Sequence, residues 1–312
     1  MKLWEKERCC MNGERRHSVK SFLQPEDDGL PTRRFGRWVT EKLYYLQNYI
    51  EVFETSMRNQ PWRRRIYVDL FAGSGKCVVK ESGEFCLGSP LLALTTKHPF
   101  TDYFFVDSNP QNIDTLRKRC SATDSSANIH YIVGDGNVEV KNIVAQIHRI
   151  DQEFIPNQWS SLNLAFLDPD GLELEWETIA TLAKVNRMDL IVHYSQQGLT
   201  RNLERFYHSD EETVIDRFFG DRGWRDIYSP WRKRSNRLGL HRELIDYYKS
   251  RLQDLGYQEV LRDDETGAEP LIRNAKRKAP LYRLLFASKH PLGHKFWKAV
   301  TRRDVYGQAK LF

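Results

Sequence analysis

Four acidic residues each follow a short apolar run, and a glycine-rich turn follows the first of them. Asp69 ends the run Ile66-Tyr-Val-Asp69, and Ala72-Gly73-Ser74-Gly75 comes directly after it. Asp107, Asp135 and Asp168 follow three later apolar runs. A buried parallel strand that leads into a small-residue turn is typical of nucleotide sites, because glycine lets the backbone approach a ligand. The pattern predicts a ligand site at one edge of a sheet.

Two well-known phosphate-binding loops fit this turn poorly. A P-loop requires a glycine where Leu70 stands and a hydroxyl residue where Cys77 stands. The dinucleotide-binding fingerprint requires a third glycine or alanine, and Val78 occupies that position. The segment 69–75, Asp-Leu-Phe-Ala-Gly-Ser-Gly, instead resembles the first motif of class I methyltransferases that use S-adenosylmethionine (SAM). A tight turn without a ligand is the remaining alternative.

The acids after the second and third apolar runs suit the two halves of a nucleoside. Asp107 follows the run Tyr103–Val106, and a carboxylate there can accept hydrogen bonds from both hydroxyls of a ribose. The alternative for Asp107 is a helix cap, and with the glycine turn in place we favour ribose binding. Asp135 can accept the exocyclic amine of adenine, but it also fits an ordinary turn.

The fourth apolar run, Leu162–Leu167, ends in Asp168-Pro169-Asp170-Gly171. If the first and fourth strands are neighbours, these acids lie beside the glycine turn. Asp168 is then the candidate catalytic residue that orients a target nitrogen or takes its proton, and Asp170 assists it. His193 lies inside the fifth apolar run, and we interpret it as a core histidine.

The elements that must position these residues alternate between strands and helices, which predicts a doubly wound, mostly parallel α/β sheet with helices on both faces. An amphipathic helix is expected over 32–58, and a loop that covers the ligand over 76–87. A helix capped by Ser89 follows, and the last two strands are expected at about 257–262 and 281–287. We expect a polar segment at 1–30 and a single domain over 31–312.

Within that domain, residues 198–235 form a basic helical insertion with interleaved aromatic residues. The aromatic residues are Tyr207, Trp224, Tyr228 and Trp231. This composition suits single-stranded nucleic acid, and it suits a protein interface as well.

The composition of the chain limits its possible partners, metal content and location. The chain has 312 residues, a net charge of +6 and a pI of about 9.0, which permits an anionic partner. Its five cysteines form no Cys-x-x-Cys pair and no zinc spacing, so we expect reduced thiols, no metal and a cytoplasmic location. No apolar run is long enough for a signal peptide or a membrane span.

Four segments together resemble the three-Cys-motif partner family, a group similar to class I SAM-dependent methyltransferases. They are Tyr67–Gly75, Gly88–Leu94, Leu167–Gly171 and Leu284–Pro291. The resemblance covers nearly the whole chain and implies a Rossmann-like seven-stranded sheet that ends in an antiparallel hairpin. It also implies SAM as cofactor, and a radical-SAM-like protein with a three-cysteine motif as partner. The implied SAM contacts are Asp69, Phe71, Gly73, Gly75, Asp107 and Asp135.

Three hypotheses for the function follow. The first is a SAM-dependent methyltransferase that acts on nucleic acid. In base methyltransferases of exocyclic amines, Asp-Pro-Pro-Tyr often follows the fourth strand, whereas this chain has Asp-Pro-Asp-Gly and lacks the aromatic residue. That departure motivates the second hypothesis, a SAM-binding or non-catalytic partner of the three-cysteine protein. The third is a nucleic-acid-binding module without SAM dependence.

Overall fold

The computed structural model describes residues 25–123, 125–153, 155–234, 239–258, 269–274 and 276–302. A seven-stranded sheet has the order β6-β5-β2-β7-β8-β10-β9, and only the pairings of β10 are antiparallel. In chain order its strands are β2 (Arg65–Asp69), β5 (Asp102–Asp107), β6 (Asn128–Val133), β7 (Leu162–Leu167), β8 (Met188–Tyr194), β9 (Leu271–Arg273) and β10 (Pro280–Ala287). This is the doubly wound sheet with a terminal antiparallel hairpin that the sequence predicts.

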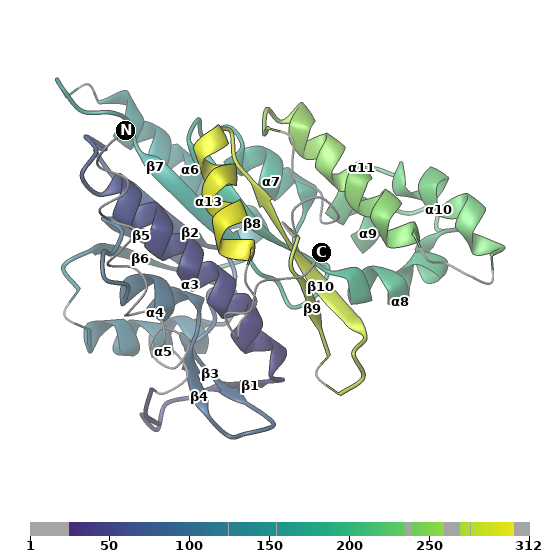
Figure 1. Cartoon of the computed structure of the whole chain (residues 1–312), viewed down its shortest axis with the longest axis horizontal. Coiled ribbons are helices and arrows are strands. Elements are labelled where there is room, and N and C mark those ends of the chain that lie inside the picture. The colour runs from purple at the N-terminus through teal and green to yellow at the C-terminus, as the bar shows by residue number, and fades with distance from the viewer. Residues whose placement is uncertain are drawn as a thin grey trace.

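Helices cover both faces of this sheet (Figure 1). One face packs against α3 (Trp38–Met57), α4 (Ser89–Leu94), α5 (Pro110–Ser121) and α13 (Pro291–Thr301). The other face packs against α6 (Gly136–Gln152), α7 (Trp176–Leu182), α8 (Gln196–Phe206), α9 (Val214–Phe219), α10 (Trp224–Arg232) and α11 (Leu240–Asp254). No helix in the described ranges combines the length and the apolar character that crossing a membrane requires.

A small second sheet corrects two expectations. The segment expected to be a ligand-covering loop at 76–87 forms a hairpin of β3 (Lys76–Val79) and β4 (Phe85–Leu87). Its β3 edge pairs with β1 (Arg33–Phe35), so the first residues of the expected helix 32–58 are extended, and α3 begins only at Trp38. The N-cap of α4 is Gly88 rather than Ser89.

The C-terminal hairpin also differs from its predicted position. The sixth strand of the large sheet, in chain order, is β9 and not the segment 257–262. Tyr257 and Gln258 lie outside any strand, and residues 259–262 fall outside the described ranges. The short strand β9 is specified by its pairing with β10, which no local pattern in the sequence reveals.

The basic insertion is part of the core rather than an aromatic binding surface. The side chains of Trp224, Tyr228 and Trp231 are buried and pack with the helices on one face of the sheet. Two arginines of α10 are paired: Arg225 lies 3.1 Å from Asp216, and Arg232 lies 2.8 Å from Glu204. Burial of these rings removes them as stacking platforms for bases.

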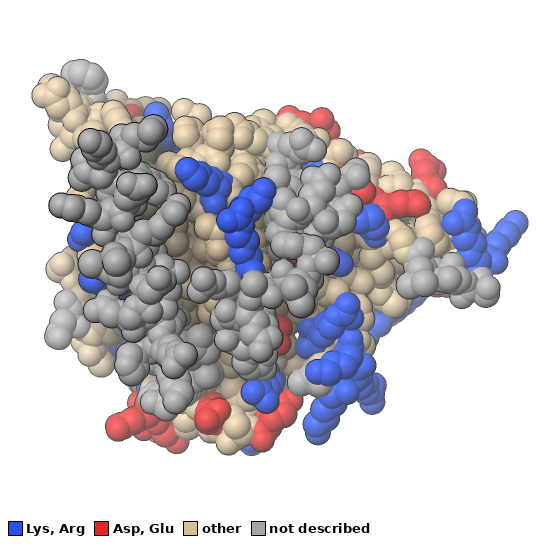
Figure 2. Space-filling view, viewed as in Figure 1, with Lys and Arg blue, Asp and Glu red and all other residues tan. Residues whose placement is uncertain are grey.

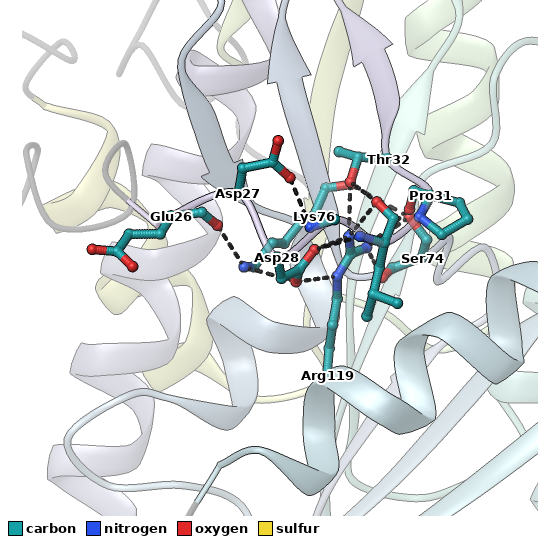
Figure 3. Close-up of polar contacts among 10 residues, drawn as sticks. Glu26, Asp27, Asp28, Pro31, Thr32, Ser74, Lys76 and Arg119 are labelled. Carbon is teal, nitrogen blue, oxygen red and sulfur yellow. Dashed lines mark hydrogen bonds and ion pairs between the residues drawn. The ribbon is translucent and has the colours of Figure 1, made fainter.

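Residues 25–32 lie against the glycine turn, although the sequence suggested a loosely attached segment up to residue 30 (Figure 3). Arg119 of α5 fastens them. Its guanidinium pairs with both oxygens of Asp28 at 2.9 Å and donates to the hydroxyl of Thr32 at 2.7 Å. The same group donates to the carbonyl of Ser74 at 2.6 Å, and therefore links the N-terminal segment to the turn.

A neutral residue in place of Arg119 should destabilise the fold. The side chain of Arg119 is almost fully buried, so its loss leaves several carbonyls without their donor and leaves Asp28 with only Lys76 and the amide of Leu30 as partners. We expect Arg119→Met to lower the free energy of unfolding by about 3 kcal/mol, as measured by urea denaturation. The control is Lys118→Met at an exposed position next to it, which should change stability by less than about 0.5 kcal/mol. Equal stability of the two variants would contradict this role.

Burial also perturbs the acid at the end of β2. Asp69 has no exposed surface, and burial raises its pKa to about 7 although Ser89 and the amide of Phe71 donate hydrogen bonds to it. An unfolded aspartate has a pKa near 3.9. The folded state therefore binds more protons between about pH 4 and 7, and the contribution of this group to stability falls as the pH rises through 7.

Replacement of Asp69 by asparagine should remove that pH dependence. We expect the free energy of unfolding of the wild type to fall relative to Asp69→Asn by about 2 kcal/mol between pH 5 and pH 8. Urea titrations of both proteins across this range measure the difference. A difference that stays constant with pH would show that Asp69 is ionised throughout.

Candidate functional site

The carboxyl edge of the sheet contains a cavity of about 680 Å3. In the strand register Asp69 lies opposite Phe105 on β5 and Phe166 on β7. Asp107 and Asp168 therefore both lie two residues further along, on either side of the glycine turn. The cavity brings together seven of the eight site residues that the sequence predicts: Phe71, Gly73, Gly75, Asp107, Asp135, Asp168 and Asp170.

Asp69 is the predicted site residue that does not reach the cavity wall. Its Oδ1 accepts the amide of Phe71 at 3.2 Å, so its carboxyl supports the turn from beneath. The aromatic ring of Phe71 packs partly on the core of the same face as α6. Asp69 thus shapes the backbone that faces the cavity without facing it.

The two glycines of the turn have different roles. Gly73 has φ +63°, and a Cβ there would meet no atom within 4 Å, so its backbone is open to the cavity. Gly75 has φ +85°, and a Cβ there would lie 2.7 Å from Leu116 and 3.1 Å from Leu91. Gly73 leaves room for a ligand, whereas Gly75 lets α4 and α5 pack against the turn.

Asp107 orders the cavity wall through both carboxylate oxygens. Oδ2 accepts the amide of Gly73 at 2.9 Å, which ties the end of β5 to the turn. Oδ1 accepts the amide of Asn109 at 2.9 Å and the side-chain amide of Asn112 at 3.0 Å. Each oxygen has two lone pairs, so the carboxylate keeps acceptor capacity for a ligand on Oδ2.

Asp135 caps α6, whereas the alternative that the sequence left open was an ordinary turn. Its Oδ1 accepts the amide of Asn137 at 2.9 Å. The residue is also exposed at the cavity, so capping and ligand binding are compatible.

Asp168 belongs to a buried charge cluster. Lys42 of α3 forms an ion pair with its Oδ2, and both side chains are only slightly exposed. His193 Nδ1 lies 3.1 Å from Oδ1 and 2.8 Å from the carbonyl of Pro169. Burial acts to raise the pKa of Asp168, but Lys42 and His193 outweigh it and lower the pKa to about 2. At neutral pH Asp168 is therefore an ionised acceptor and a poor general base.

One oxygen of this carboxylate remains available. In the described part of the chain Oδ1 is buried and accepts no hydrogen bond, because the N–H of His193 is directed to Pro169. A buried acceptor without a donor is costly unless a ligand or water supplies one. The geometry therefore suits a donor group that enters the cavity.

Lys42, His193 and Tyr282 are site residues that the sequence analysis did not assign. The ring of Tyr282 in β10 lies 4.1 Å from that of His193, and Lys42 Nζ lies 5.9 Å from the Tyr282 ring centre. Lys42 falls on the apolar stripe of the helix, three residues after Val39 and four before Leu46. A lysine on a core-facing stripe is the signal that could have identified it.

The remaining candidates surround this cluster. Asp170 is half exposed and pairs with Arg33 of β1. It also lines a neighbouring cavity of about 340 Å3 with Ser195 and Gln197. Trp176 is buried in the core. A further, mostly apolar cavity of about 590 Å3 lies at the opposite edge of the sheet, where β7 and β8 begin.

The residues present fit an adenosine-type cofactor. The cavity volume lies in the range of small-molecule sites, the backbone of Gly73 is open, and carboxylates stand at two strand ends. Asp107 could hold a ribose and Asp135 an adenine amine. In the described ranges no three His, Cys, Asp or Glu side chains are grouped to hold a metal ion.

No protein-family model matches the sequence, and no curated protein matches it. Among solved structures, Trm1 from Pyrococcus horikoshii with SAM is 10% identical, with a TM-score of 0.40 over 88% of this chain and 61% of that one. Trm5 from Methanocaldococcus jannaschii with adenosine is 10% identical, with a TM-score of 0.35 over 82% and 49%.

A third solved structure is magnesium protoporphyrin IX methyltransferase from Synechocystis with bound SAH. It is 11% identical, with a TM-score of 0.36 over 81% of this chain and 86% of that one. This chain thus spans less than two thirds of Trm1 and Trm5. The assignment of a Rossmann-like, mostly parallel seven-stranded sheet rests on its strand order and register.

Proposed function

We propose that this protein is a SAM-dependent methyltransferase whose acceptor is a nitrogen atom of a nucleic acid. The observation that carries the proposal is the buried, ionised Asp168, whose Oδ1 accepts no hydrogen bond from the described residues, in the same cavity as the glycine turn. Residues 71–75, Asp107 and Asp135 would hold the cofactor, with Asp69 supporting the turn from beneath. When bound, SAM supplies an electrophilic methyl group on a sulfonium.

The residues of the chain then have to align and stabilise the acceptor. Asp168 Oδ1 accepts an N–H of the target amine and fixes the direction of its lone pair. Positive charge would develop on that nitrogen as the new N–C bond forms and the sulfur–methyl bond breaks, and the ionised carboxylate would stabilise it until the nitrogen releases its proton to solvent. Lys42 holds Asp168 in place, and Lys42 and the nearby His193 favour its ionised form. Asp170, at the rim, would assist with the incoming substrate.

An exocyclic amine of a nucleobase fits these requirements, because it is neutral and carries an N–H donor. The positive net charge of the chain also favours an anionic substrate. The aromatic residue that often follows such an acid is missing here, where Asp170-Gly171 stands instead. Base recognition would then use other groups around the rim.

The missing aromatic residue after Asp168 favours a second candidate function. A chain that binds SAM but does not transfer its methyl group could serve as the partner of a radical-SAM-like three-Cys-motif protein. The observation that supports it is the ion pair that occupies Asp168 Oδ2. Co-purification with such a protein, and loss of that protein's activity without this chain, would favour this alternative over methyl transfer by this chain alone.

The cofactor assignment is tested by isothermal titration of the purified protein with SAM and with S-adenosylhomocysteine. Asp107→Ala removes a charged acceptor and releases the amide of Gly73, so we expect about 30-fold weaker binding, or about 2 kcal/mol. The control is Asp114→Ala on the exposed side of α5, which should bind as the wild type does. Absence of binding by the wild type, or equal binding by Asp107→Ala, would refute the site.

The role of Asp168 is tested by methyl transfer from labelled SAM to RNA and DNA. Asp168→Asn keeps the volume of the side chain but removes the negative charge, so we expect the rate to fall by about 100-fold or more with SAM affinity largely unchanged. Asp170→Asn, at a half-exposed position, should reduce the rate by about tenfold or less. An active Asp168→Asn enzyme would exclude this carboxylate from the transfer step.

A further inference from the structure

Four cationic side chains project from the hairpin between β9 and β10. They are Arg273, Lys276, Arg277 and Lys278, which we call the hairpin cations, and all four are exposed. In the described part of the chain none of them has an ion pair with a carboxylate. Figure 2 shows Lys and Arg side chains gathered over this hairpin. They form a patch of positive charge that no carboxylate of the described residues neutralises.

Hydrogen bonds join the described residues of the turn that carries these cations. Asn274 Oδ1 accepts the backbone amides of Lys276 at 3.0 Å and Arg277 at 2.9 Å. The amide of Lys278 donates to the carbonyl of Asn274 at 2.9 Å, and Arg273 donates to the carbonyl of Lys278 at 3.0 Å. A hydrogen-bonded turn presents charges with less loss of conformational freedom on binding than a flexible tail would.

The hairpin extends beyond the edge of the sheet that carries the cavity. Arg283 of β10 pairs with Tyr194, the last residue of β8, so the residues before Arg283 lie past the carboxyl end of that strand. Tyr282, next to it, contacts the ring of His193 in the Asp168 cluster. Lys278 is four residues earlier, which corresponds to about 13 Å along an extended strand.

The two ends of the hairpin therefore have different functions. The root of the hairpin contacts His193, which lies 3.1 Å from the acid that would receive the target base, and its tip carries the charges. A base that leaves its stack to reach a buried acid keeps its flanking phosphates outside the cavity. Phosphates attract exposed lysine and arginine side chains regardless of sequence. The rings of Trp224, Tyr228 and Trp231 in the α8–α10 region are buried, so they cannot stack on bases.

We propose that the β9–β10 hairpin binds the phosphate backbone of the nucleic acid strand whose target base enters the cavity. This inference rests on the proposed function for the identity of the acceptor. It adds the element that holds the substrate and predicts binding that is strongly salt-dependent and independent of base sequence.

The test is fluorescence anisotropy with labelled single strands of RNA and of DNA, about 12 nucleotides long, and with a duplex of the same length. The variant combines Lys276→Ala, Arg277→Ala and Lys278→Asn. Asparagine is chosen at position 278 because its backbone has φ +55°, a region that asparagine tolerates better than alanine. The protein is otherwise the full chain.

We expect the hairpin variant to bind a single strand about 100-fold more weakly at 0.1 M salt. The slope of log affinity against log salt should become shallower by about 2, as expected for three lost phosphate contacts. The control combines Lys97→Ala, Lys118→Ala and Lys141→Ala, which removes the same charge from exposed positions outside the cavity lining. The control should retain wild-type affinity and slope.

Three results would overturn the proposal. Equal weakening by both triple variants would show that net charge alone governs binding. Unchanged affinity of the hairpin variant would place the phosphate contacts elsewhere. Binding of polyglutamate but of no nucleic acid would identify an acidic protein as the partner of the hairpin.

The same variants distinguish a failure of this inference from a failure of the proposed function. Isothermal titration with SAM should be unaffected in the hairpin variant, because the hairpin cations do not line the cofactor cavity. Loss of strand binding in a protein that binds no SAM would support the hairpin assignment and reject methyl transfer. Methyl transfer to nucleic acid that is unaffected by the hairpin variant, at strand concentrations below saturation, would reject the hairpin assignment alone.

Discussion

The site depends on the hydrogen-bonded register of the central strand. β2 pairs in parallel with β5 on one side and β7 on the other, and Asp69 is opposite a phenylalanine on both. Asp107 and Asp168 therefore end their strands at the same level, roughly 10 Å apart across two strand spacings. The glycine turn leaves β2 between them. A slip of one residue on either side would turn one carboxylate to the other face of the sheet, so the buried register determines the chemistry of the edge.

A second constraint is the cost of buried charge. Asp168 is ionised in a poorly hydrated place only because α3 brings Lys42 to it, and an unpaired buried carboxylate would otherwise be protonated or destabilising. The helix that precedes the sheet thus completes the site. Arg119 plays a similar part on the opposite side of the turn, where it joins Asp28 to Ser74. Charged groups from outside the central strands set the shape of the cavity on both sides.

The features that the sequence predicted correctly are those encoded by neighbouring residues in the chain. The strand from Leu162 to Leu167 was predicted closely, because an apolar run is a local pattern. Seven predicted site residues meet in one cavity because parallel strands share a carboxyl edge. The β1–β3 pairing, the strand β9 and the role of Lys42 were missed, since each depends on a partner that is distant in the chain. The burial of Trp224 and Tyr228 was missed because composition does not reveal which face of a helix meets the core.

The electrostatics of Asp168 also restrict the kind of acceptor that the site can serve. A hydroxyl acceptor must lose its proton as it attacks, and a carboxylate whose pKa is lowered to about 2 is a weak base for that purpose. A neutral amine attacks with its own lone pair and becomes positively charged, which an adjacent fixed anion favours. The pairing of Asp168 with Lys42 therefore selects for nitrogen over oxygen. Removal of the lysine charge would therefore make the carboxylate a stronger base. The same change would weaken the alignment of the acceptor on which transfer depends.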